Sequence, residues 1–100
     1  MVKYTANLTV DGSHIAMNEF VESFLANTVV GAVHSLKGVD FMKRIQLKID
    51  GSDVTIEVNG EDITLTAFPN KLIGNTVKGL LLSLKNVDTI RSLDISVDVR

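Results

Sequence analysis

The sequence predicts an α+β fold built from two tandem ββαβ repeats. Residues 4–50 align without a gap on residues 52–98, at an offset of 48, with 14 identical pairs and many conservative exchanges. Such self-similarity at a fixed period indicates a duplicated supersecondary unit. A unit of about 50 residues buries too little surface to be stable alone, so the two repeats must share one core within a single domain, residues 1–100. We expect pseudo-two-fold symmetry and a curved, mainly antiparallel six-stranded sheet with two long helices on one face. The alternative is a six-stranded double-psi-like barrel.

Each repeat begins with a pattern typical of a β-hairpin. Apolar residues alternate with polar ones from Tyr4 to Val10, the period of a strand with one buried face. Asp11-Gly12 is a type I′ turn signal, because both central residues of that turn need positive φ. This turn places Leu8 opposite Ile15. The second repeat has the turn Asn59-Gly60 and places Ile56 opposite Ile63.

A helix follows each hairpin, over about residues 18–37 and 66–85. Asn18 and Thr66 occupy equivalent N-cap positions. Both helices are predicted to end at a residue that readily adopts the left-handed C′ conformation, Gly38 in the first helix and Asn86 in the second, with a lysine just before it that complements the helix dipole. The two lysines are Lys37 and Lys85.

A strand closes each repeat, with alternating apolar residues at 45, 47 and 49 and at 93, 95, 97 and 99. The four residues 50–53 are too few to run back along a strand, so they predict a hairpin between the repeats. If each helix returns the chain along the strand direction, the first and fourth strands run parallel.

A broad apolar stripe on each helix is expected to face the core. The stripe on the first helix includes Phe20, Phe24, Leu25, Thr28, Val29 and Gly31, and the stripe on the second includes their counterparts Phe68, Leu72, Ile73, Thr76, Val77 and Gly79. A glycine inside a helix costs about 1 kcal/mol relative to alanine, so Gly31 and its counterpart Gly79 are expected to allow close packing. Polar residues border these glycines, and the alternative is that they line a small-molecule site. The candidate ligand-binding residues are Asn27, Ser35, Asn75 and Ser83.

The opposite face of each helix carries apolar side chains where solvent is expected. These candidate interface residues are Val30, Val33, Leu81 and Leu82. Neighbouring exposed apolar residues are typical of a protein interface, so a homo-oligomer is expected.

The sequence shows no chemistry of an enzyme. Cysteine is absent, which excludes thiolate catalysis and sulfur ligation of a metal. His14 and His34 lack further ligands at a usable spacing, and turn formation accounts for Asp50 and Asp53. We therefore expect no catalytic residues, no metal and no cofactor. There is no signal sequence and no apolar run near the ~20 residues of a membrane span, so a cytoplasmic protein without a membrane partner is expected.

Nucleic acid is an improbable partner on charge grounds. The chain has 10 basic and 12 acidic residues, and neither repeat is basic. Strand residues Lys3, Arg44 and Lys48 lie among acidic neighbours on the outer face of the sheet, where no aromatic residue is predicted for base stacking. The function hypotheses are, in order, a non-enzymatic self-associating module, a small-molecule binding protein and a nucleic-acid binder.

The turn and cap residues resemble a family of small uncharacterised archaeal proteins with a single ββαβ unit. The resemblance is carried by Val-(Asp/Asn)-Gly-x-x-Ile, by Asn27-Thr28-x-x-Gly31 and by the run Ser35-Leu36-Lys37-Gly38. It covers the first repeat best. The resemblance implies no activity, but it implies that the fused pair stands in for a homodimer of single units.

Overall fold

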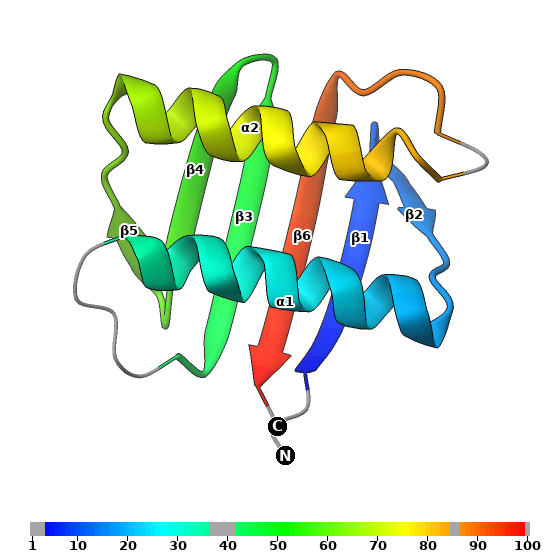
Figure 1. The fold of residues 1–100 in the computed structure, drawn as a ribbon, viewed down its shortest axis with the longest axis horizontal. Helices are drawn as coiled ribbons and strands as arrows, with labels where there is room; N and C mark the ends of the chain where they lie inside the picture. The colour runs from blue at the N-terminus through cyan, green and yellow to red at the C-terminus, as the bar shows by residue number, and fades with distance from the viewer. Residues whose placement is uncertain (1–3, 37–41, 85–86, 100) are drawn as a thin grey trace.

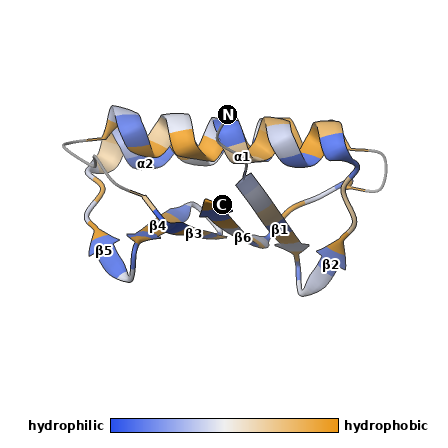
Figure 2. Cartoon of the chain, turned by 90° about the horizontal axis from the view of Figure 1, so that it is seen from below, coloured by the Kyte–Doolittle hydropathy of each residue, from blue (hydrophilic) through white to orange (hydrophobic). Residues whose placement is uncertain are grey.

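The protein is a two-layer α+β structure, described here for residues 4–36, 42–84 and 87–99 of a computed structural model. One layer is a six-stranded antiparallel sheet and the other is a pair of helices that cover one of its faces (Figures 1 and 2). The elements are β1 (Tyr4–Val10), β2 (Ser13–Ile15), α1 (Glu19–Ser35), β3 (Arg44–Asp50), β4 (Asp53–Val58), β5 (Glu61–Ile63), α2 (Ala67–Leu81) and β6 (Ser92–Val99). The strand order is β2-β1-β6-β3-β4-β5, an open sheet, so the barrel alternative is wrong.

The two predicted hairpins are confirmed in type and register. Leu8 pairs with Ile15 and Ile56 pairs with Ile63. In the turns, Asp11 and Asn59 have φ of 49° and 53°, and the glycines after them have φ of 83° and 87°. Positive φ at both central positions is the requirement of the type I′ turn.

The expectation that the first and fourth strands run parallel is wrong. β6 pairs antiparallel with both β1 and β3, and β3 pairs antiparallel with β4, so β1 and β4 run in opposite directions. The physical reason is visible in Figure 1, where both helices cross the strands at a steep angle. A crossing helix does not return the chain along the strand direction. The predicted hairpin between β3 and β4 is confirmed, with Gly51 at φ 62°.

The two faces of the sheet differ completely in polarity. On the four central strands, every residue that faces the helices is apolar, and all of them are buried except Tyr4 and Val99 at the strand ends, which are partly buried. The residues between them, on the other face, are all polar or charged, from Thr5 in β1 to Asp98 in β6. Some of them pair across strands: Gln46 donates to Asp94 at 2.8 Å, and Arg44 lies 3.8 Å from Asp98.

The buried stripe of each helix overlaps only in part with the expected one: Leu25, Val29, Ile73 and Val77 are buried as predicted, but the phenylalanines are not. Phe20 and Phe68 are each 72% exposed, whereas Val33 and Leu81 are fully buried. The buried residues of the helices are Leu25, Ala26, Val29, Val30 and Val33 of α1, and Ile73, Gly74, Val77 and Leu81 of α2. Most are small or β-branched, and such side chains allow a helix to lie close to the sheet. Because apolar residues occur around most of the circumference of α1, the periodicity alone did not identify the buried side.

Close packing of Gly31 and Gly79 is also wrong. A Cβ atom built on either glycine meets no heavy atom within 4 Å. The glycine that does allow a close approach is Gly74, where a Cβ would lie 3.2 Å from Cγ2 of Val54 in the sheet.

Polar side chains connect the helices and turns to the sheet. Glu22 accepts a hydrogen bond from the Ala6 amide at 2.9 Å, and Asn70 accepts one from the Val54 amide at 2.8 Å. Both amides belong to residues of β1 or β4 that the short outer strands leave unpaired on that side. The helices thus cap the open edges of the sheet.

The turn residues cap strands of the opposite half. Asp11 accepts from the amides of Arg91 and Ser92, both at 2.8 Å, where β6 begins. Asn59 accepts from the amides of Lys43 and Arg44, at 2.7 and 3.1 Å, where β3 begins.

The helix ends are confirmed in part. The Asn18 side chain accepts from the Val21 amide at 2.8 Å, as an N-cap should, but Thr66 makes no such bond. The predicted C-terminal residues Lys37, Gly38, Lys85 and Asn86 lie outside the described residues.

Candidate interaction surface on the helix layer

The largest exposed apolar side chains of the described residues all lie on or at the end of the two helices. Phe20 and Phe68 are 72% exposed, Phe24 and Leu72 are 53% exposed, and Leu82 is 48% exposed. We call these five residues the apolar patch. Phe20 and Phe24 also contact each other, with ring centroids 5.9 Å apart. The apolar patch exposes roughly 550 Å² in total, taking ~200 Å² for a fully exposed aromatic side chain and slightly less for leucine. The area is a sum over side chains near the start of α1 and near the start of α2, which lie at opposite ends of the antiparallel helix pair (Figure 1).

Each helix has a bulky half and a small half on its solvent side. Phe20, Phe24, Asn27 and Gly31 follow the i, i+4, i+7, i+11 spacing of one face of α1. That face begins with two phenylalanines and ends in glycine and serine. The face of α2 follows the same order, with Phe68 and Leu72 first and Asn75, Gly79 and Ser83 last.

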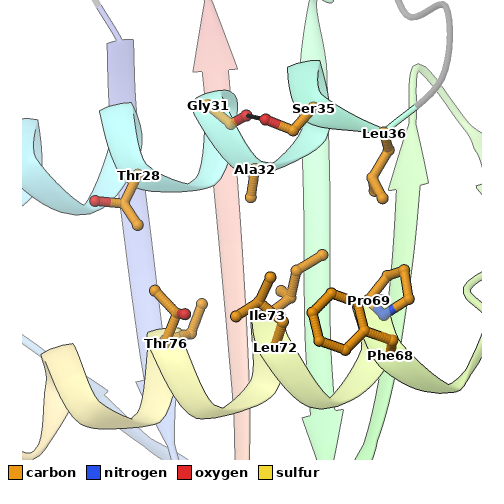
Figure 3. A pocket seen from close by; sticks show the side chains of 11 residues that line it. Thr28, Gly31, Ala32, Ser35, Leu36, Phe68, Pro69, Leu72, Ile73 and Thr76 are labelled. Carbon is orange, nitrogen blue, oxygen red and sulfur yellow. Dashed lines mark hydrogen bonds between the residues drawn. The ribbon is translucent and has the colours of Figure 1, made fainter.

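The space between the helices forms two apolar cavities. Because α1 and α2 run antiparallel, the bulky half of each helix lies beside the small half of the other (Figure 1). The larger cavity, of about 460 Å³, lies between the end of α1 and the start of α2. Figure 3 shows Ala32 of α1 pointing toward Ile73 of α2, and Leu36, at the end of α1, pointing toward Pro69. The smaller cavity, of about 360 Å³, lies between the start of α1 and the end of α2, with Phe24 and Leu80 among its lining residues.

The predicted polar cleft does not form between the helices. Asn27 and Asn75 are exposed, and neither lines a cavity described above. The hydroxyl of Ser35 lines the larger cavity but donates to the Gly31 carbonyl at 2.9 Å. Ser83 lines the smaller cavity and donates in the same way to Gly79, at 3.3 Å. These four residues are therefore not brought together, and the cavities present mainly carbon.

Three of the four predicted interface residues are in the core. Val30 is 7% exposed, and Val33 and Leu81 are fully buried. Only Leu82 is exposed, and it belongs to the apolar patch. The prediction failed because each helix is rotated about its own axis relative to the predicted orientation. The phenylalanines assigned to the core face solvent, and the valines assigned to solvent are buried. An exposed apolar surface was correctly expected, but on the wrong side of each helix.

The two helices carry opposite charge. Glu19 and Glu22 give α1 a net charge of −2 with His34 neutral, and Lys71 and Lys78 give α2 a net charge of +2. Lys78 also donates to the carbonyl of Gly51, and Glu22 caps the sheet edge, so both side chains lean toward the sheet. Glu19, His34 and Lys71 are exposed.

Other candidate chemistry is dispersed over the described part of the chain. Within residues 4–36, 42–84 and 87–99, no group of three or more histidine or acidic side chains is placed to hold a metal ion. His14 lies on β2 and His34 on α1, in different layers. Over the same residues, neither helix has the length and hydropathy needed to cross a membrane.

The pKa of the Asp11 carboxyl lies below its usual value. The hydrogen bonds from the Ser92 and Arg91 amides are the main cause, and the nearby Arg91 charge adds to them. The shift follows from the hydrogen bonds by which Asp11 caps the start of β6.

Comparisons with known proteins give no relative for this chain: no protein-family model matches it, no curated protein is detectably similar, and no solved structure matches its fold.

Proposed function

We propose that this protein is a non-enzymatic interaction module whose binding surface is the helix layer. The observation that supports this best is the contrast between its two faces. The helix layer exposes three phenylalanines and two leucines, whereas the central strands present only polar residues on the outer face of the sheet. A soluble domain has no structural reason to expose aromatic rings at 72%, and neighbouring exposed apolar residues are typical of protein interfaces.

The residues of this surface suit binding rather than catalysis. They are phenylalanine, leucine and glycine, together with hydroxyl groups that already donate to their own helix. None can act as a general base, and nucleophilic use of Ser35 or Ser83 would need a base beside it.

We also propose that the two halves are diverged copies of one ββαβ unit, related by a two-fold axis normal to the sheet. Two observations support this. The edge caps of Glu22 and Asn70 recur at the alignment offset of 48, and so do the turn caps of Asp11 and Asn59. In addition, Leu47 pairs with Ile95, its own counterpart, so the axis would pass through this pair. Duplication would give the helix layer two similar halves for one partner.

The test replaces the exposed helix residues by glutamine, a good helix former. In the variant Phe20→Gln, Phe24→Gln, Phe68→Gln and Leu72→Gln, we expect each substitution to lower the free energy of unfolding by about 1 kcal/mol, since only a quarter to a half of each side chain is buried and the glutamine stem keeps part of that contact. We expect the folded variant, at submicromolar concentration, to lose binding of anilinonaphthalene sulfonate, a probe of exposed apolar surface.

A matched control is Leu25→Gln, next to Phe24 in sequence but fully buried. It should cost several kcal/mol, because it places an amide in the core. If any one of the four substitutions alone destabilises the protein as much as Leu25→Gln, or if the quadruple variant keeps the probe binding of the parent, the helix layer is not an apolar binding surface.

A second candidate function is binding of a small apolar molecule in the larger cavity, whose volume of about 460 Å³ is in the range of ligand sites. Ala32 lines this cavity, and its counterpart in the smaller cavity is Leu80. Ala32→Leu should therefore weaken the binding of diphenylhexatriene, a rod-shaped apolar fluorophore, while Ser23→Leu on the outer flank of α1 should not. Equal binding by both variants and the parent would contradict this use of the cavity.

A further inference from the structure

We infer that the partner of the helix layer is a second copy of this chain, docked face to face with α1 of each copy along α2 of the other. This inference rests on the proposed function, because it names the occupant of the same surface. In this arrangement the two-fold axis between the copies runs parallel to the helices, over the space between them. Each α1 then lies antiparallel to the α2 beneath it.

The first argument is that the surface is complementary to itself in shape. The antiparallel arrangement puts the start of α1 from the second copy, with Phe20 and Phe24, over the end of α2, where Gly79 and Ser83 lie. It also puts the end of that α1, with Gly31, over the start of α2. Bulky residues meet small ones at both ends, as close helix packing requires.

The glycines gain a role in this arrangement that they lack within one chain. Gly31 and Gly79 each cost about 1 kcal/mol in helix stability relative to alanine. Nothing within the chain uses the space above them, because a Cβ there meets no heavy atom within 4 Å. Both glycines lie on the face that also carries the phenylalanines. A helix of a second copy over this face would use the space left by the missing side chains.

The second argument is area. The apolar patch supplies roughly 550 Å² per chain, and a stable interface buries ~800 Å² on each partner. The helices are ~25 Å and ~22 Å long, at 1.5 Å per residue, and lie side by side over a sheet of similar extent. The polar and small residues between the members of the patch can supply the remaining ~250 Å². The helix layer of a second copy has the same length and width, so it would cover this helix layer completely.

The third argument is charge, which selects between two possible arrangements. Shape alone also permits α1 on α1 and α2 on α2, because both helices have the same order of bulky and small residues. Glu22 and Lys78 are held at the sheet, but the exposed Glu19 and Lys71 still leave α1 negative and α2 positive on the solvent side, so that alternative places helices of like charge against each other. The arrangement with α1 on α2 pairs opposite charges in both helix contacts, so it is favoured.

The first experiment measures association by light scattering and sedimentation over a range of concentrations. We expect the parent to form a dimer and the quadruple glutamine variant to be monomeric. Gly79→Gln should weaken the dimer at least tenfold because it fills the space opposite Phe24 of the second copy. It should not destabilise the subunit, since the site is open within one chain. Thr55→Gln, on the outer face of the sheet, is the control and should leave the dimer unchanged.

The second experiment tests the arrangement through His34, which is exposed on the flank of α1. With α1 on α2, His34 lies about one turn from Lys71 of the second copy. With α1 on α1, it lies beside Glu19 of the second copy instead. Relative to the neutral His34→Gln, the variant His34→Glu should tighten the dimer about two- to tenfold, and His34→Lys should weaken it by a similar factor. The reverse order would overturn the inferred arrangement.

The outcomes separate this inference from the proposed function. A parent that stays monomeric at millimolar concentration, while its dye binding still depends on the four replaced residues, would overturn the second copy as partner and leave the binding surface intact. A dimer that the quadruple glutamine variant retains would overturn both.

Discussion

Alanine substitution at three helix glycines tests the packing of the two layers. Replacing a helix glycine by alanine stabilises the helix by about 1 kcal/mol when the new Cβ meets no obstacle. Gly31 and Gly79 meet that condition, because nothing lies within 4 Å of the new atom. At Gly74 the Cβ would lie 3.2 Å from Cγ2 of Val54, closer than an ordinary contact. Val54 is buried and its amide is held by Asn70, so it can yield only by straining the sheet edge.

The three variants should therefore separate in free energy of unfolding. We expect Gly31→Ala and Gly79→Ala to gain about 1 kcal/mol each, and Gly74→Ala to gain nothing or lose up to about 2 kcal/mol through overpacking. Urea denaturation of each variant in the association-deficient quadruple glutamine background measures this without a contribution from dimerisation. The reasoning is refuted if Gly74→Ala is as stabilising as the other two.

A compensating change identifies the obstacle as Val54. The positions corresponding to Gly74 and Val54 in the first half are Ala26 and Ala6, so the larger helix residue there occurs with the smaller strand residue. Adding Val54→Ala to Gly74→Ala reproduces that pair. We expect a favourable coupling of about 1 kcal/mol in the double-mutant cycle. Zero coupling would show that the two residues do not limit each other.

Three further predictions concern the polar links and the shared core. Glu22→Ala should leave the Ala6 amide without its acceptor, lower stability by about 1 kcal/mol and speed hydrogen exchange at that amide, whereas an unchanged exchange rate would contradict the edge cap. Because the pKa of Asp11 is lower in the folded state, its contribution to stability should be complete above the unfolded pKa and lost as pH falls through the folded pKa. Asp11→Asn should keep the turn, and its free energy of unfolding should fall less steeply than that of the parent as the pH is lowered. Residues 1–50 alone lack β6, the strand that lies between β1 and β3, so circular dichroism and light scattering should show an unfolded or dimeric fragment rather than a folded monomer.

Local features of this fold could be predicted from the sequence, because they depend on neighbouring residues. The turns at Asp11 and Asn59, the hairpin registers and the buried face of each strand follow from a period of two and from residues that tolerate positive φ. The edge cap by Glu22 was missed. The sequence offered one indication of this cap: Glu22 is a charged residue on the buried side of α1, one turn before the fully buried Ala26.

The orientation of the helices could not be predicted in the same way. Apolar residues surround most of α1, so the choice between Phe24 and Val33 as the core residue depends on how closely the helix approaches the sheet. That distance is a tertiary property. The steep crossing of helix over strands is another, and it determines that β1 and β4 run in opposite directions. The candidate surface was therefore predicted in kind but placed on the buried valines.

The central claim is that Phe20 and Phe68 face solvent in one chain and are covered by a second chain. Hydroxyl-radical footprinting with mass spectrometry reads the exposure of individual aromatic side chains over a range of protein concentrations. At submicromolar concentration we predict rapid oxidation of Phe20 and Phe68, with Leu25 protected. As the concentration rises through the range where light scattering detects the dimer, oxidation of both phenylalanines should fall and that of Tyr4 should not change. Phenylalanines that are protected even at the lowest concentration, or equally oxidised at every concentration, would contradict the account.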